Sequence, residues 1–323
     1  MSDQEPVWRS LGATPCWTSE SLREQLDGGQ AFRWHLQPDD TWLGYWGNRI
    51  AQLKWSKTSN LHWQPTSPID DAFELELRAY LALDSTETCG LSDDLPWLTD
   101  AHLRRCMEAF PSLRILRQPF GETLLGFLCS ATKQIVQIKQ MMALLAKRHG
   151  TPYAHTSLPN PSISQVLPKS HCHITYDNDS NTPEYKFFML PTWGQLAEVS
   201  ETELRACQLG FRARYIKGTA DYIAEHPGWL EHTATLPYAE AKEALCTLPG
   251  VGEKIADCVA LFGLGHQQAF PVDTWMIKAM QRRYGLEGWT PSQVAHFGRV
   301  HFGAHAGLAQ QYLFAWERAH GGR

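Results

Sequence analysis

Two residues in the last third of the chain could together perform covalent chemistry on an electrophilic carbon. Lys254 follows the glycine-rich segment LPGVG, and Asp273 comes nineteen residues later, directly before another helical pattern. The helix dipole disfavours an ammonium on a first turn by about 0.3 to 1 kcal/mol, and desolvation would favour the free amine. Such an amine is a nucleophile able to form a Schiff base, and a nearby carboxylate would complete a charge-paired couple. A solvated surface lysine and a helix-capping aspartate are the alternatives that spacing alone leaves open.

The segment that carries the lysine has the pattern of two helices joined by a tight glycine turn. Within residues 248–265, LPGVGEKIADCVALFGLG, Gly250 and Gly252 permit positive φ and leave space beside the backbone. The backbone N–H groups there and at the start of the second helix, as far as Ile255, can point at an anion. A DNA phosphate fits such a site without base preference. An ordinary αα-hairpin, in which the glycines only turn the chain, is the alternative.

The composition is that of a folded protein without a membrane span. The chain has 323 residues, of which 43% are hydrophobic and 20% charged, so it can form two domains with real cores. No apolar stretch approaches the roughly 20 residues that span a bilayer, and the start MSDQEPVWRS lacks a secretion signal. Eight dispersed cysteines without a C-x2-C pair fit free thiols in a reducing compartment. We therefore expect an intracellular protein.

The charge is unevenly distributed along the chain. The net charge of −5 divides into −9 over residues 1–100 and +4 over residues 101–323. Because phosphates respond to local clusters of Lys and Arg, a net-acidic protein is not excluded from binding nucleic acid. Any DNA-binding surface should lie in the later part, where the basic runs at 211–217 and 281–283 are candidate phosphate contacts.

Strand patterns are followed by helix patterns along the chain. The first ninety residues contain alternating apolar and polar pairs with turn formers, as in TWLGYWGNRIAQLKW from 41 to 55, which predicts strands and hairpins. From about residue 91 the apolar spacing is helical, for example in YAEAKEALCTL, EKIADCVALFG and TWMIKAMQRRYG. We expect a strand-rich domain, residues 1–90, and a helical domain, residues 91–323, with a surface insertion at about 154–184.

Several segments resemble the 8-oxoguanine DNA glycosylases of the helix-hairpin-helix superfamily. LPGVGEKIADC and PVDTWM are similar to the Gly/Pro-rich hairpin and aspartate of that superfamily. The segments that narrow the match are GGQAFRW at 28–34, LRILRQPFGETLLGFLCS at 113–130, LGFRARY at 209–215 and GLAQQYLF at 307–314. The resemblance implies an α+β fold, in which a twisted antiparallel β-sheet domain precedes an all-α helix-hairpin-helix domain. It also implies that the damaged nucleotide is flipped out of the duplex.

The resemblance further implies a bifunctional DNA N-glycosylase and AP lyase of base-excision repair. Lys254 matches the lysine that attacks C1′ of the deoxyribose, displaces the base and forms an imine. Asp273 matches the aspartate that stabilises positive charge developing on the sugar. The imine makes the C2′ proton acidic, so elimination of the 3′-phosphate can follow. The implied partner is double-stranded DNA that contains oxidised guanine.

Residues for base recognition are also implied position by position. Gly29 matches the glycine whose carbonyl accepts a hydrogen bond from N7–H of 8-oxoguanine, a donor that guanine lacks. Cys258 and Phe314 match the residues that sandwich the flipped base, and Gln310 matches the amide that reads its Watson–Crick edge. Taken singly, such residues are more often core side chains or a surface amide, so only their joint match supports these roles.

The residues that face the opposite strand depart from the family pattern. Where the family has an asparagine, an arginine, a tyrosine and a second arginine, this chain has Thr132, Gln137, Phe211 and Arg212. Phe211 can still wedge into the base stack, because wedging needs an apolar plane. The neutral Gln137 lacks fixed donors for cytosine, so we expect weaker discrimination of the opposite base. Trp275 replaces a histidine near the phosphate site, which puts that contact in doubt.

Metal and iron–sulfur sites are not expected. The adjacent residues HCH at 171–173 have no partner pair at a suitable spacing, and adjacent residues rarely converge on one ion. His301 and His305 lack the glutamate of a zincin motif. No cysteine follows Cys258, so the four-cysteine iron–sulfur loop of some superfamily members is absent. We expect a monomer without a cofactor, acting where the DNA is, in the cytoplasm or nucleoid of a bacterium or the nucleus of a eukaryote.

Two other functions stay open on the sequence alone. A glycosylase of the same fold that acts on alkylated bases uses an aspartate and no lysine, and Lys254 speaks against it. A non-catalytic DNA-binding homologue would keep the hairpin for phosphates and lose the chemistry. The intact pair of Lys254 and Asp273 argues against that alternative.

Overall fold

The computed structural model describes residues 8–13, 17–56, 60–65, 70–83, 96, 99–153, 173–176 and 183–321. The chain divides into two compact units, each assembled from three separate stretches of sequence. Unit 1 comprises Met1–Thr14, Phe32–Leu77 and Leu128–Pro227, and unit 2 comprises Pro15–Ala31, Arg78–Phe127 and Gly228–Arg323. The domain boundary expected near residue 90 lies outside the described residues and stays a prediction.

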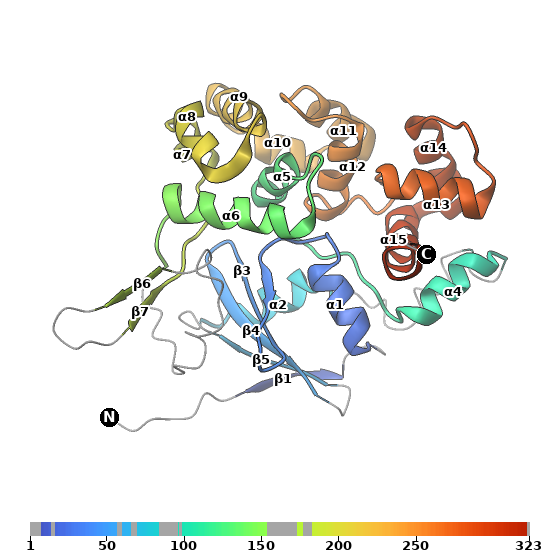
Figure 1. The fold of residues 1–323 in the computed structure, drawn as a ribbon, viewed down its shortest axis with the longest axis horizontal. Coiled ribbons are helices and arrows are strands. Elements are labelled where there is room, and N and C mark those ends of the chain that lie inside the picture. The colour runs from blue at the N-terminus through green and yellow to red at the C-terminus, as the bar shows by residue number, and fades with distance from the viewer. Residues whose placement is uncertain are drawn as a thin grey trace. The chain divides into compact units, whose positions relative to one another are not determined.

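Unit 1 contains a five-stranded antiparallel sheet with the strand order β1-β5-β4-β3-β2 (Figure 1). The strands are β1 (Arg9–Ala13), β2 (Trp34–Leu36), β3 (Thr41–Trp46), β4 (Arg49–Trp55) and β5 (Asn60–Pro65). β3 and β4 form a hairpin that closes at the Trp46–Arg49 pair, and its two-residue turn uses Gly47 at φ +50°. The predicted antiparallel sheet is therefore confirmed.

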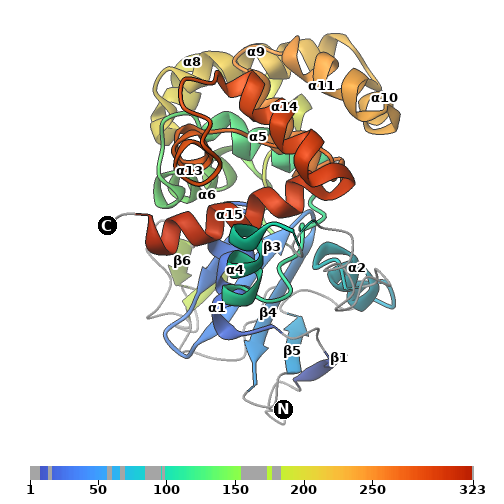
Figure 2. The same cartoon turned by 90° about the vertical axis from the view of Figure 1, so that its right-hand side faces the viewer.

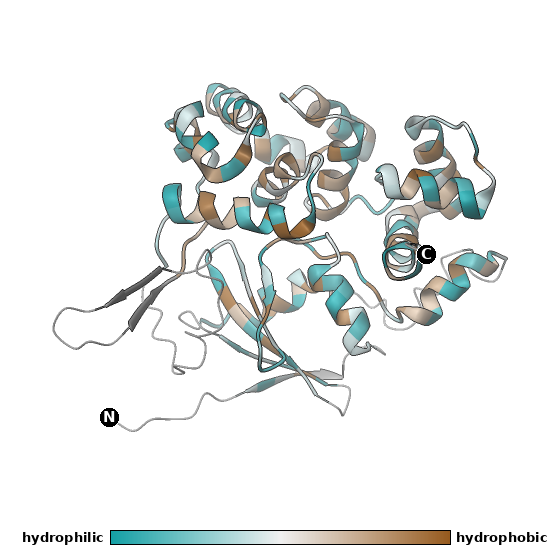
Figure 3. Ribbon diagram, viewed as in Figure 1, coloured by the Kyte–Doolittle hydropathy of each residue, from teal (hydrophilic) through white to brown (hydrophobic). Residues whose placement is uncertain are grey.

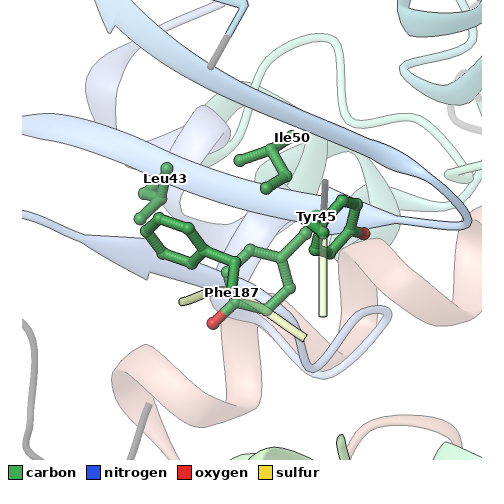
Figure 4. Close-up of a cluster of buried hydrophobic side chains, with 5 residues drawn as sticks. Leu43, Tyr45, Ile50 and Phe187 are labelled. Carbon is green, nitrogen blue, oxygen red and sulfur yellow. The ribbon is translucent and has the colours of Figure 1, made fainter. Parts of the chain in front are cut away.

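Both faces of strand β3 are covered. All six residues of β3 are buried, and successive side chains of a strand point to opposite faces. Trp46 meets Phe73 edge-on at a centroid distance of 6.2 Å, and Tyr45 packs against Phe187 at 6.3 Å. The cluster on the Tyr45 side consists of Leu43, Tyr45, Ile50, Tyr153 and Phe187 (Figure 4). Because both of its faces are occupied, β3 lies in the interior of unit 1.

Two helices lie where the sequence pattern predicts only strands, and the prediction is wrong there. α1 (Ser19–Asp27) begins at Thr18, whose side chain accepts a hydrogen bond from the N–H of Ser21. α2 (Phe73–Tyr80) reads FELELRAY, in which apolar and charged residues alternate as in a strand. It buries Phe73 and Leu77 completely while Leu75 is 63% exposed. In a strand Phe73, Leu75 and Leu77 would all lie on one face, whereas in a helix residues 73 and 77 share a face that excludes residue 75. The observed burial therefore fits a helix and not a strand.

The remainder of unit 1 is mostly helical. Its elements are α6 (Ile135–His149), β6 (His173–Tyr176), β7 (Pro183–Lys186), α7 (Trp193–Ala197), α8 (Glu201–Leu204), the π-turn η3 (Arg205–Leu209) and α9 (Arg212–Glu225). Thr192 and Ser200 begin α7 and α8 with reciprocal capping boxes. β6 and β7 form a separate antiparallel pair within and just after the expected insertion (Figure 1). The rest of that insertion lies outside the described residues.

Unit 2 is built from helices. They are α1, α4 (Ala101–Ala109), most of α5 (Phe120–Cys129), α10 (Trp229–Thr235), α11 (Tyr238–Cys246), α12 (Glu253–Phe262), α13 (Thr274–Tyr284), α14 (Pro291–Phe302), the 3-10 turn η4 (Gly303–His305) and α15 (Ala306–His320). Figure 2 shows α13, α14 and α15 side by side. The helices predicted beyond residue 91 are confirmed, and the chain as a whole has the expected α+β fold.

Apolar residues concentrate on the helices at the centre of unit 2. α5 and α12 carry long apolar stretches, seen in brown in Figure 3. Phe127 of α5 stacks on Phe262 of α12 at a centroid distance of 5.6 Å. Among the described helices, none is both long enough and apolar enough to cross a bilayer. α12 is thus a core helix of unit 2, and its first turn carries the candidate nucleophile.

Candidate active site

The glycine turn between α11 and α12 has the geometry of an anion site. Gly250 has φ +78°, a conformation that glycine adopts without strain. Gly252 is the N-cap of α12 and provides no side-chain cap, and a Cβ placed there would meet nothing within 4 Å. The first amide bonded back into the helix is that of Ala256, 2.9 Å from the Gly252 carbonyl. The amides of residues 253–255 therefore precede the hydrogen-bonded helix, where an anion is stabilised.

Apolar side chains hold this turn in place. Leu248, Val251 and Ile255 are 2%, 6% and 8% exposed, whereas Gly250 and Gly252 are exposed. Burial of the three side chains fixes the turn on the core and leaves its backbone at the surface. The predicted hairpin is thus present, and Ile255 supports it through its buried side chain.

The two helices of the hairpin are also joined by a buried polar group that the sequence analysis missed. Asp257 of α12 is 1% exposed. Its carboxylate accepts a hydrogen bond from the Tyr238 hydroxyl at 2.6 Å and pairs with Lys242 Nζ at 3.1 Å. Burial raises the pKa of Asp257, and both partners from α11 act against that rise. In the sequence the signal was an aspartate within the apolar run IADCVALF, preceded by two polar residues one helical turn apart, Tyr238 and Lys242.

Lys254 lies half-buried on the first turn of α12. Its Nζ is 5.4 Å from the centre of the Phe127 ring, so an aromatic face covers one side of the amine. Cys258 lies one turn further along α12, and the Lys254 side chain reaches its thiol. The lysine therefore points along α12 into unit 2, unlike a solvated surface lysine.

Asp273 is held at the first turn of the next helix. Its Oδ1 accepts a hydrogen bond from the N–H of Met276 at 2.8 Å, so it caps α13. The carboxylate is half-buried. Since capping uses one carboxylate oxygen, the other is available for a second role. The capping alternative and the catalytic alternative are therefore compatible.

The Cys258 thiol is influenced by both Lys254 and Asp273. Burial raises the pKa of Cys258 to about 11, the Lys254 ammonium opposes the rise, and the carboxylates of Asp257 and Asp273 add to it. Electrostatic effects of this kind weaken with distance, so all three charged groups belong to the surroundings of this thiol. An amine and a carboxylate that share such a site can form and stabilise a cationic imine.

α12 and α15 approach each other closely at Gly307, within two helical turns of three of the four base-recognition candidates. A Cβ on Gly307 would lie 2.3 Å from Cδ1 of Leu261 and 2.9 Å from the Ala269 carbonyl oxygen, so only glycine permits this approach. Cys258 lies three residues before Leu261, the residue of α12 that Gly307 contacts. The two candidates on α15, Gln310 and Phe314, lie three and seven residues beyond Gly307. These spacings place them on the facing sides of the two helices.

The side chains on α15 differ in exposure. Gln310 is buried, with 4% exposed, and its Oε1 accepts a hydrogen bond from Nε2 of Gln311 at 2.6 Å. Phe314 is half-buried and Cys258 is 4% exposed. A buried amide needs partners, so Gln310 is not the surface amide of the alternative interpretation. The pattern fits a small site with an apolar ring, a thiol and one orienting amide.

Gly29 is held by a hydrogen-bond network that the sequence analysis also missed. The residue has φ +106° and follows the end of α1. The Gln30 amide, 1% exposed, donates to the Arg114 carbonyl oxygen and accepts from the Leu116 N–H, each at 2.9 Å. Gln118 donates from Nε2 to the Gln30 carbonyl oxygen at 2.6 Å.

Gln118 also connects this network to α12. Its N–H donates to the Phe262 carbonyl oxygen at 3.0 Å, four residues after Cys258. The Gly29 backbone is therefore tied to the helix that carries Lys254 and Cys258. All catalytic and base-recognition candidates belong to unit 2.

The four opposite-strand candidates belong to unit 1, and the structure brings three of them together. Arg212 is 3% exposed and donates to Oγ1 of Thr132 at 3.0 Å, while its guanidinium lies 4.4 Å from the Phe211 ring centre. Phe211 is 44% exposed. Gln137 sits on the first turn of α6, where its Oε1 accepts a hydrogen bond from the Gln134 N–H. Their contacts with DNA stay predictions.

The other residues noted in the sequence have structural surroundings. Trp275, two residues after Asp273, is 49% exposed. His301 Nε2 lies 3.0 Å from Oδ2 of Asp100, which also accepts from the Tyr284 hydroxyl at 2.9 Å. Within the described residues, no group of three or more His, Cys, Asp or Glu side chains could hold a metal ion. Residues 171 and 172 lie outside the described part.

Comparisons with known proteins show to which family this chain belongs. A family model described as the N-terminal domain of 8-oxoguanine DNA glycosylase matches residues 17–124. A second, described as HhH-GPD superfamily base excision DNA repair protein, matches residues 174–300 and so includes the hairpin and Asp273. The fold and the hairpin thus define a helix-hairpin-helix protein of base-excision repair.

Individual relatives narrow the assignment. N-glycosylase/DNA lyase OGG1 of Arabidopsis thaliana is 33% identical over 329 residues, which cover 97% of this chain and 80% of the relative. A probable N-glycosylase/DNA lyase of Methanothermobacter thermautotrophicus is 27% identical, covering 72% of each chain. The 8-oxoguanine glycosylase/lyase of Clostridium acetobutylicum, in complex with double-stranded DNA containing cytosine opposite 8-oxoG, superposes with a TM-score of 0.79 at 26% identity over 98% of both chains. The chain belongs to the 8-oxoguanine DNA glycosylase/lyase family.

Proposed function

We propose that this protein excises 8-oxoguanine from duplex DNA and then cleaves the strand at the resulting site, with Lys254 as the nucleophile and Asp273 as its charged partner. The observation that carries the proposal is the half-buried position of Lys254 on the first turn of α12, beside the glycine turn and against the Phe127 ring, together with Asp273 at the first turn of α13. Membership of the glycosylase/lyase family supports the same chemistry.

The first half of the reaction exchanges the base for the lysine. Nζ of Lys254, as the free amine, forms a bond to C1′ while the C1′–N9 bond breaks and the base leaves with the electron pair. The nucleobase takes up the proton that the attached nitrogen loses. The C1′–O4′ bond then breaks, O4′ takes up a proton from solvent to become a hydroxyl, and the nitrogen lone pair forms the C=N bond of a protonated imine. The carboxylate of Asp273 stabilises the positive charge that develops on the sugar. The Phe127 ring excludes water from one side of the amine.

The second half of the reaction breaks the DNA strand. The cationic imine withdraws electrons from C2′, so a base can remove a C2′ proton. The electron pair forms the C2′–C3′ double bond, and the 3′-phosphate leaves with the electrons of the C3′–O bond. Hydrolysis of the imine then returns Lys254 to its amine form. The protein itself supplies the groups for these steps, so the proposal needs no cofactor.

Specificity for the oxidised base depends on one proton. The Gly29 carbonyl accepts from N7–H of 8-oxoguanine, whereas guanine would place its N7 lone pair against the same oxygen. The bonds of Gln30 and Gln118 hold that backbone, which a discriminating acceptor requires. Cys258 and Phe314 enclose the base from α12 and α15, and Gln310 reads its edge.

The protein contacts the DNA backbone and the opposite strand through different groups. The amides that follow Gly250 and Gly252, including that of Ile255, receive a phosphate at the start of α12. The exposed ring of Phe211 fills the space vacated by the flipped nucleotide. Because Gln137 offers no charged fork to cytosine, the preference for the base opposite the lesion is weak. The enzyme acts as a monomer in the compartment that holds the DNA.

Borohydride trapping tests the proposal directly. Wild type, Lys254→Gln and Lys278→Gln are incubated with duplexes carrying 8-oxoguanine opposite each of the four bases and with an undamaged duplex. Lys278 is an exposed lysine on α13 and serves as the matched control. We expect a covalent adduct on damaged DNA with wild type and Lys278→Gln, and none with Lys254→Gln. Trapping of Lys254→Gln at the wild-type rate would show that another amine is the nucleophile.

The same assay tests the remaining assignments. A duplex with an alkylated base should give no adduct, because the proposed specificity is for the N7–H donor of 8-oxoguanine. A rate with cytosine opposite the lesion that greatly exceeds the other three would contradict the role given to Gln137.

A further inference from the structure

Two short loops in unit 1 have backbone conformations that residues with a Cβ rarely adopt. Thr132, between α5 and α6, has φ +55°, and Gln208, before α9, has φ +63°. This left-handed conformation is disfavoured for both residue types, so each loop needs contacts that hold it there. We name residues 130–134 loop A and residues 207–211 loop B.

The Arg212 side chain joins the two loops. Its Nη1 donates to the Leu209 carbonyl oxygen of loop B at 3.1 Å. Its Nη2 donates to the Ala131 carbonyl oxygen and, at 3.0 Å, to Oγ1 of Thr132, both in loop A. One planar guanidinium therefore bonds three acceptors on two loops.

Arg212 cannot offer these donors to a base without breaking the connection. The residue is 3% exposed, so its guanidinium lies beneath the surface that the loops form. Hydrogen bonds from a charged donor are stronger than neutral ones, and losing them inside a protein leaves the carbonyl groups unpaired. The side chain is therefore committed to the loops.

The same arginine fixes the exposed ring next to it. The Arg212 guanidinium lies 4.4 Å from the centre of the Phe211 ring, and the Tyr215 ring meets Phe211 edge-on at 6.0 Å. Phe211 belongs to loop B and is 44% exposed. An exposed phenylalanine that contacts a cation and a second ring has a defined orientation.

We propose that Arg212 is a positioning residue, which holds loops A and B together and presents Phe211 to the duplex, and that it does not read the base opposite the lesion. The DNA part of this inference rests on the proposed function. Because the arginine acts through Phe211 and the loops, its contribution to excision is the same whichever base lies opposite.

Opposite-base dependence separates a positioning role from a reading role. Single-turnover excision is measured for wild type and Arg212→Lys on the four duplexes with each base opposite 8-oxoguanine. Lysine has no planar fork, so we expect a loss of about tenfold that is equal for all four bases. A loss confined to the cytosine duplex would overturn the proposal, because it would mean that the guanidinium reads cytosine.

A rescue experiment tests whether backbone strain is what Arg212 opposes. Gln208→Gly removes the Cβ that disfavours φ +63° and should restore part of the excision lost in Arg212→Lys. Asp40→Gly relieves a similar conformation, φ +59°, in the turn between β2 and β3 and should restore none. Equal effects of the two glycine variants, or no rescue by Gln208→Gly, would contradict the proposal.

A measurement without DNA keeps this inference separate from the proposed function. Hydrogen exchange of the amides in loops A and B is followed in the full chain, and we expect it to be about tenfold faster in Arg212→Lys. Arg205→Lys is the control, since Arg205 in η3 is exposed and pairs with Glu201. Unchanged exchange in Arg212→Lys would overturn the positioning role. Absence of excision by wild type would overturn the proposed function and leave the exchange result valid.

Discussion

The Tyr238 hydroxyl donates a hydrogen bond of 2.6 Å to the buried carboxylate of Asp257 and so joins the two helices of the hairpin that carries Lys254. Burial raises the pKa of Asp257, and Tyr238 and Lys242 of α11, together with Arg299 of α14, act against that rise. The position of Lys254, the proposed nucleophile, therefore depends on a polar contact outside the reacting atoms.

Tyr238→Phe should destabilise the protein. The change removes a donor from a buried carboxylate, and we expect the free energy of unfolding at pH 7 to fall by about 1 to 3 kcal/mol. Excision should slow as well, because the hairpin loses one of the bonds that align α11 and α12. Urea unfolding and single-turnover excision measure the two effects. An unchanged unfolding free energy would mean that the hydroxyl contributes nothing to the hairpin.

The loss in Tyr238→Phe should also depend on pH. A donated hydrogen bond favours the ionised carboxylate, so its removal raises the pKa of Asp257 further above the ordinary value, which is that of the unfolded chain. At a pH above the pKa of Asp257 in the folded variant, Tyr238→Phe causes its full loss of unfolding free energy. As the pH falls through that pKa, Asp257 becomes protonated and the loss of unfolding free energy becomes smaller. The difference in unfolding free energy between wild type and variant should therefore be smaller at pH 4.5 than at pH 7.

Asp273→Asn should separate the two roles of Asp273. Asparagine is as good an N-cap as aspartate, so the bond to the Met276 N–H persists and stability should change by less than about 0.5 kcal/mol. The charge that stabilises the developing cation is lost, and excision should fall by about 100- to 1,000-fold. Unfolding and single-turnover measurements on the same preparation test both statements.

Thr290→Ala is the matched control for the cap. Thr290 begins α14 by accepting a hydrogen bond from the Gln293 N–H, and its removal should cost about 1 kcal/mol of stability. Excision should stay at the wild-type rate. If Asp273→Asn, like Thr290→Ala, excised the base at the wild-type rate, Asp273 would be a capping residue without a role in the chemistry.

The buried thiol of Cys258, one helical turn after Lys254, should be unreactive. Cys258 is 4% exposed, and burial raises its pKa to about 11, so little thiolate exists at neutral pH. Cys246, at the end of α11, is exposed. Iodoacetamide at pH 7.5 should therefore label Cys246 before Cys258 in the native protein, as measured by peptide mass mapping, and both should react after unfolding. Labelling of Cys258 at the same rate would show that the site is open to solvent.

The hairpin could be predicted because it depends on local signals. Gly250 and Gly252 mark the turn, the apolar spacing marks the flanking helices, and Lys254 follows directly at the start of α12. Asp273 is recognisable in the same way as a residue before a helix. Each of these features is set within a few residues, so no knowledge of the tertiary structure is required.

The polar groups that hold the site in place could not be predicted. Gln30 bonds to Arg114, 84 residues away, and Gln118 bonds back to Gln30 across 88 residues. Such partners are chosen by tertiary packing and leave no periodic pattern in the sequence. The strand prediction for the alternating residues of α2 was wrong for a related reason. The joint burial of Phe73 and Leu77 in the tertiary structure determined that this segment is a helix.

Gly307→Ala should disrupt the base-recognition site through packing alone. Its Cβ would lie 2.3 Å from Cδ1 of Leu261, so α15 must move away from α12 and carry Gln310 and Phe314 with it. We expect a loss of about 1 to 3 kcal/mol in unfolding free energy and a marked fall in single-turnover excision. Gly194→Ala in α7 is the matched control, because the added Cβ meets only Thr192 Oγ1 at 3.9 Å and alanine favours a helix. If Gly307→Ala and Gly194→Ala had similar unfolding free energies and similar rates of excision, the close approach of α12 and α15 would not shape the site.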